Sequence, residues 1–139
     1  MITTTSLDQI KEQIKQIINS IESIASLSPG KPIDLQVFQQ AQKILKNISF
    51  KLNFALASAQ EEDNWEFVDM LFEAIEQCDD ALNAVTAATL RQVLISPDHD
   101  QIIAELQNIK RDIDAAIQAE KVLNFFMRLT RVIIRFVAV

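Results

Sequence analysis

The chain has 139 residues, enough for one domain with a single core, and its formal net charge is −6. Glycine occurs once and proline three times, so folds that need many turns, such as β-sandwiches and α/β sheets, are excluded. Because nucleic-acid binding depends on cations that neutralise phosphates, the acidic balance also argues against a nucleic-acid partner.

The first predicted helix covers about residues 7–27. Ser6 and Gln9 have the spacing of a capping box, in which each side chain bonds to the backbone N–H of the other residue. Apolar residues then recur at alternating intervals of three and four, the pattern of one helix face: Leu7, Ile10, Ile14, Ile17, Ile21 and Ile24. Residues 28–32 hold the one glycine and two of the three prolines, and they form the clearest loop.

A second helix is predicted over about residues 34–61 and a third over about 64–95. The second helix has apolar residues at the same intervals, and Phe50 and Phe54 widen this apolar surface. The residues of the repeat are Phe38, Ala41, Leu45, Ile48, Leu52, Ala55 and Ala59. Asp63 is the predicted cap of the third helix, and Trp65 is predicted to anchor the start of that helix in the core.

The third predicted helix has two contrasting faces. Its apolar face consists of Val68, Leu71, Ile75, Cys78, Leu82 and Val85. Five acidic residues with the same spacing form what we call the acidic ridge: Glu66, Asp69, Glu73, Glu76 and Asp80. Since the loop signature of a calcium site is absent, we expect the ridge to be solvated rather than to bind a metal.

A fourth helix is predicted over about residues 97–119, where Ser96 and Pro97 provide a capping residue and a favoured first position. Its apolar face consists of Ile102, Leu106, Ile109, Ile113 and Ala116. Short connections between helices favour antiparallel neighbours. The sequence therefore predicts an all-α fold, a single domain over 1–139 arranged as an up-down-up-down four-helix bundle.

Residues 120–139 form a last predicted helix that a simple bundle of four helices does not account for. No glycine or proline follows Asp98, and one helix from there to Val139 would be about 63 Å long and overhang the bundle. We therefore predict an extended or kinked, strongly apolar C-terminal helix, which can count as a fifth. A lone membrane-spanning helix is disfavoured, because three arginines cost about 9 kcal/mol whereas thirteen apolar residues return about 4–8 kcal/mol.

The C-terminal helix carries the candidate interaction residues. Its polar positions form what we call the basic stripe: Lys121, Arg128, Arg131 and Arg135. The candidate apolar contacts are Phe125, Phe126, Ile133 and Phe136. Three interpretations are open. The helix folds back at a kink near 119–121 or packs in a homodimer; it lies on an anionic membrane surface; or it docks in another protein's groove.

No catalytic, cofactor or metal site is predicted. His99, the one histidine, stands at a helix start, and the Glu-x-x-His pairs that di-iron bundles require do not occur. Cys78, the one cysteine, lies on the apolar face of its helix, where a thiol is buried and inert. The sequence thus predicts a protein that is not an enzyme.

The leading functional hypothesis is a non-enzymatic helical-bundle protein that acts through protein–protein association. We expect a homo-oligomer, or another protein bound through the C-terminal helix. The alternative is a peripheral protein that binds or perturbs an anionic membrane with the arginine-striped helix. The N-terminal residues lack the basic and apolar regions of a signal peptide, so we expect a cytoplasmic location, either free or peripheral to a membrane.

Overall fold

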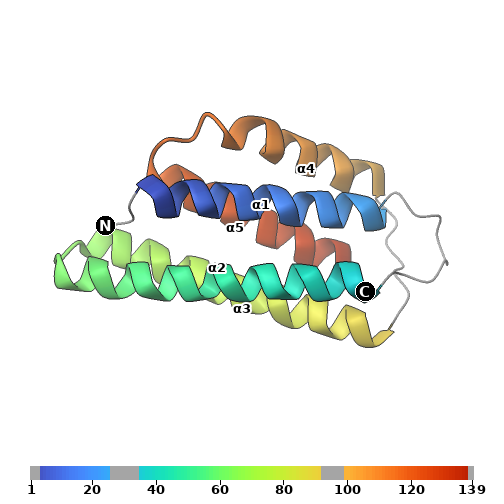
Figure 1. Cartoon of the computed structure of the whole chain (residues 1–139), viewed down its shortest axis with the longest axis horizontal. Helices are drawn as coiled ribbons and strands as arrows, with labels where there is room; N and C mark the ends of the chain where they lie inside the picture. Colours follow the sequence, from blue (N-terminus) through green and yellow to red (C-terminus); the bar gives the residue numbers. More distant parts are fainter. Residues whose placement is uncertain (1–3, 26–34, 92–98, 138–139) are drawn as a thin grey trace.

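The computed structural model describes residues 4–25, 35–91 and 99–137, and within these residues every regular element is a helix. The five helices are α1 (Thr4–Ala25), α2 (Leu35–Glu61), α3 (Trp65–Arg91), α4 (His99–Ile113) and α5 (Ala119–Val137). Consecutive helices run in opposite directions along the long axis of the molecule (Figure 1). The predicted all-α class is confirmed for the described residues.

The helix bounds differ most from prediction where α4 ends. Helix α4 stops at Ile113, not near residue 119. Hydrogen bonds from Ala115 N to Asp112 O (3.2 Å) and from Ala116 N to Ile113 O (3.0 Å) tighten the chain into a turn. The turn has no glycine or proline to signal it. Tertiary packing stabilises it instead, because the turn lets α5 return to the core. The predicted loop at 28–32 and the predicted start at Ser96 lie outside the described residues.

The turn between α2 and α3 corrects the predicted cap. Asp63 has a φ of 56°, in the left-handed region that short polar side chains tolerate better than most. The N–H of Asn64 donates to Ala59 O at 3.0 Å and closes the end of α2. The side-chain Oδ1 of Asn64 accepts from Phe67 N at 3.4 Å. Asn64 is therefore the cap of α3, and Asp63 is the residue that reverses the chain.

The core is shared by all five helices. Helix α3 packs against both α2 and α5, and α1 contacts α2, α4 and α5. In Figure 1, α5 runs between α4 and the α2–α3 pair. Its inward residues are buried: Val122, Leu123, Phe126, Met127, Leu129, Val132, Ile133 and Phe136. The C-terminal helix thus folds back onto its own chain, at a turn over 114–118 that precedes the predicted position near 119–121.

One polar side chain is buried within this interface between α3 and α5. The hydroxyl of Thr130 lies 2.7 Å from Met127 O and 3.2 Å from Gln77 Oε1. A hydroxyl has one proton to donate, and both acceptors lie within its reach. The bond to Met127 satisfies Thr130 within α5, whereas the contact with Gln77 links α5 to α3.

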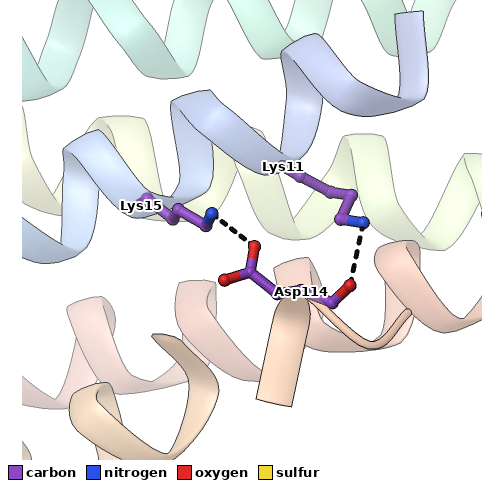
Figure 2. Close-up of polar contacts among 3 residues, drawn as sticks. All are labelled: Lys11, Lys15 and Asp114. Atoms are coloured by element: carbon purple, nitrogen blue, oxygen red, sulfur yellow. Dashed lines mark hydrogen bonds and ion pairs between the residues drawn. The ribbon is translucent and has the colours of Figure 1, made fainter. Parts of the chain in front are cut away.

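The connection between α4 and α5 is attached to α1 by Asp114 (Figure 2). The Asp114 carboxylate pairs with Lys15, and Lys11 Nζ donates to the Asp114 carbonyl oxygen at 3.4 Å. Both lysines belong to α1, so two successive turns of one helix hold the same residue. The hydrogen bond from Lys15, with further attraction by the Lys15 and Lys11 charges, lowers the pKa of Asp114, and the same bond raises the pKa of Lys15.

Replacing Asp114 with asparagine is expected to weaken the acid dependence of stability. A carboxyl group with a lowered pKa in the folded state stabilises the fold above its unfolded-state pKa, and this contribution is lost as the pH falls through the folded-state value. Urea midpoints measured at descending pH from neutrality should therefore fall less in Asp114→Asn than in the wild type. Asp112→Asn is the matched control, since Asp112 pairs with its sequence neighbour Arg111 rather than with α1. Equal slopes in wild type and Asp114→Asn would contradict the expectation.

Candidate functional site

The structure separates the predicted C-terminal candidates into two groups. The four residues of the basic stripe are all exposed on α5. Phe126, Ile133 and Phe136 are fully buried, and Phe125 is partly buried. The basic side chains are therefore available to a ligand, whereas most of the apolar side chains already have partners within the chain.

A groove between α4 and α5 gathers most of the basic stripe. It encloses about 220 Å³ and is lined by Glu105, Ile109, Arg128, Arg131, Val132 and Arg135. Arg135 pairs with Glu105 across the groove. The guanidinium carbon of Arg128 lies 5.5 Å from the centre of the Phe125 ring, within the range of a cation–π contact. Two of the three arginines are thus held in place by neighbours. We call this site the arginine groove.

The acidic ridge lies on the outward face of α3, and all five of its residues are exposed. Among the residues that the structure describes, no ion pair joins the ridge to the basic stripe, since the stripe's pairing is Arg135 with Glu105 of α4. The acidic ridge and the basic stripe are therefore not paired within the described part of the chain.

The largest exposed apolar side chains form a second candidate site. Phe50 and Phe54 of α2 are 75% and 71% exposed, and Trp65 and Phe72 of α3 are 59% and 52% exposed. Helices α2 and α3 pack against each other. Phe54 precedes Asp63 by nine residues and Phe72 follows it by nine, so the antiparallel pair places them at the same distance from the turn. We call these four residues the aromatic face.

The aromatic face corrects two sequence expectations. Trp65 does not anchor the start of α3 in the core, and Phe50 and Phe54 do not add to the buried surface of α2. A signal was present in the sequence. Phe50 and Phe54 are each two positions from the buried Leu52, which at about 100° per residue places them on the opposite side of the helix.

The charge around the aromatic face is strongly negative. Residues 61–80 contain nine acids and no base, and each of the nine is exposed. These acids are Glu61, Glu62, Asp63, Glu66, Asp69, Glu73, Glu76, Asp79 and Asp80. Lys43 and Lys46, the exposed cations of α2, lie farther from the turn than either phenylalanine of the face. Lys51, which stands between the two phenylalanines, is half-buried and donates to Gln13 Oε1 of α1 at 3.1 Å. The face therefore combines large apolar side chains with a negative field.

Among the described residues, the side chains that could act as nucleophiles or metal ligands are not arranged for catalysis or metal binding. Cys78 is fully buried, and its thiol donates to Leu45 O at 3.4 Å. Burial, with the charge of Asp79 adding to it, raises the pKa of this thiol to about 12. Among the described residues, no three His, Cys, Asp or Glu side chains gather in a way that could hold a metal ion. His99 begins α4, and its side chain lies outside the described residues.

Across residues 4–25, 35–91 and 99–137, every helix falls short of the length and apolar character needed to span a bilayer. Comparisons with protein-family models, with curated proteins and with solved structures find no match to this chain. The aromatic face and the arginine groove are therefore the two candidate functional surfaces of the described residues.

Proposed function

We propose that the chain is a non-enzymatic helical-bundle protein that acts by binding another protein through its aromatic face. In this proposal α1, α2, α3 and α5 form the four-helix bundle, and α4 packs outside it on α1 and α5. The observation that carries the proposal is the aromatic face itself, four large aromatic side chains more than half exposed on two neighbouring helices. Large exposed apolar side chains that gather on neighbouring elements are typical of interaction sites, and aromatic residues are enriched in protein interfaces.

The partner that fits this face presents lysines or arginines beside apolar side chains. Nine exposed acids lie within residues 61–80, the stretch that also contains Trp65 and Phe72, so a cationic partner is attracted and oriented by the field. A second copy packed face to face would bring two acidic ridges together, and juxtaposed like charges cost free energy. The electrostatics therefore favour a basic amphipathic segment of another protein over a homodimer through this face.

This proposal moves the contact away from the C-terminal helix. The apolar face of α5 contributes eight buried side chains to the core. At about 1.5–3 kcal/mol each, exposing them would cost about 12–24 kcal/mol, which equals or exceeds the total stability of a typical domain. A peripheral membrane protein that inserts α5 is the alternative, and it requires the bilayer to offset this loss. A cytoplasmic location remains part of the proposal.

Trp65 provides a direct test, because it is the one tryptophan of the chain and belongs to the aromatic face. The probe is a synthetic amphipathic helical peptide of leucine and lysine, with a leucine and glutamate peptide as the charge control. Binding of the lysine peptide should shift Trp65 emission to shorter wavelength and protect it from iodide quenching. The glutamate peptide should change neither. No response to the lysine peptide, or equal responses to both, would contradict the proposal.

Variants test whether peptide binding depends on the aromatic face. Phe50→Ser together with Phe54→Ser should weaken lysine-peptide binding by about tenfold or more, as expected for the loss of two aromatic anchors. Ile117→Ser is the matched control, because Ile117 is 80% exposed but lies in the α4–α5 connection. Sedimentation velocity without peptide tests the homo-oligomer. If the wild type is a dimer and the phenylalanine variant is a monomer, the partner of the aromatic face is a second copy of the chain and not a basic segment of another protein.

A further inference from the structure

The arginine groove has the composition of an anion site. Its lining contributes three arginines, one carboxylate and two aliphatic side chains. In a chain with a net charge of −6, this groove has a local excess of two positive charges, since three guanidinium groups face one carboxylate. Its volume of about 220 Å³ is well above the roughly 10–15 Å³ that a cavity needs, on the same measure, to hold one water. A small tetrahedral anion therefore fits.

The three arginines are arranged for shared recognition of one group. Arg135 is held by Glu105, and Arg128 is held against the Phe125 ring. Arg131, one turn from each of them on α5, makes no ion pair with any described residue. Two of the guanidinium groups are already held by neighbours, and only Arg131 has to move toward a ligand. Binding therefore costs less side-chain conformational entropy than it would if all three arginines were mobile.

We propose that the arginine groove binds a phosphate group. A carboxylate offers two acceptor oxygens, whereas a phosphate offers three or more, enough for several guanidinium groups to donate to it at once. The phosphate belongs either to a soluble phosphate compound or to a lipid headgroup. Both sources share the chemistry that the groove recognises. The site is independent of the aromatic face, since it lies between α4 and α5 rather than on α2 and α3.

The first experimental arm uses inorganic pyrophosphate with the full chain at low ionic strength. Calorimetric titration should show saturable binding, and chloride at equal ionic strength should not compete in a saturable manner. Arg131→Gln should weaken binding about tenfold, the effect of losing a hydrogen bond between charged groups. Arg111→Gln is the matched control. It removes the same charge from an arginine of α4 that is outside the groove, and binding should change little.

The second arm uses phosphatidylcholine vesicles with and without phosphatidic acid. If the natural source is a headgroup, the chain should sediment with the phosphatidic acid vesicles, Arg131→Gln should reduce this, and pyrophosphate should compete. If the source is soluble, pyrophosphate should bind and the vesicles should not. Absence of binding in both arms would overturn the proposal. So would equal losses in Arg131→Gln and Arg111→Gln, since that result would show attraction by overall charge alone.

Discussion

Replacing Phe126 with alanine is expected to lower the free energy of unfolding by about 3–5 kcal/mol. Phe126 lies in the middle of α5 and is fully buried. The loss combines the transfer free energy of the ring with the cavity left behind it, because neighbouring helices relax only in part. Since a domain of this size is stable by about 5–15 kcal/mol in total, urea unfolding followed by circular dichroism should show a large shift of the midpoint.

The matched control for Phe126 is Phe54→Ala, a change of the same residue type on the aromatic face. Phe54 is 71% exposed, so its replacement should alter stability by about 0.5 kcal/mol or less. If both variants unfolded like the wild type, α5 would contribute nothing to the core. Its apolar face would then be free to bind a membrane or a partner. In that case α5, and not the aromatic face, would be the better candidate for the binding surface.

Periodicity predicted most of the inward residues of the first three helices, although Ile18, Ala74 and Ala81 are fully buried outside the predicted faces. Ile10, Ile14 and Ile17 of α1 follow the apolar spacing and are all buried. The reason is geometric, because residues three and four apart share one side of a helix and that side must pack against a neighbour. Such local regularity also separates the exposed acidic ridge from the buried side of α3.

The end of α4 and the two candidate sites depend on tertiary structure. Helix α4 ends at Ile113 because α5 returns to pack on α3, and no local residue signals that reversal. The arginine groove forms only when Glu105 and Ile109 of α4 meet α5. The sequence alone does not distinguish what covers an apolar helix surface. The same chain, a second copy and a bilayer each remove the same side chains from water.

The Cys78 thiol should be almost inert in the folded protein. Its pKa of about 12 lies three units above the ordinary value of 9.0, so at pH 8 the thiolate is about a thousandfold rarer than in an unperturbed cysteine. Complete burial adds a steric block. Reaction with a disulfide reagent should therefore be slow in native buffer and fast in concentrated urea. Rapid reaction of the native protein would contradict the placement of α3 in the core.

Thiol labelling of Phe126→Ala then measures how α3 and α5 open. Where opening is fast relative to labelling, the Cys78 rate follows the population of the open state. A loss of about 3–5 kcal/mol raises the fully unfolded population by about 10²- to 10³-fold or more. An increase of that size in the labelling rate would show that Cys78 becomes accessible only when α3 and α5 unfold together in one cooperative step. An unchanged rate would show that Cys78 is reached by local opening of α2 and α3, with α5 still in place.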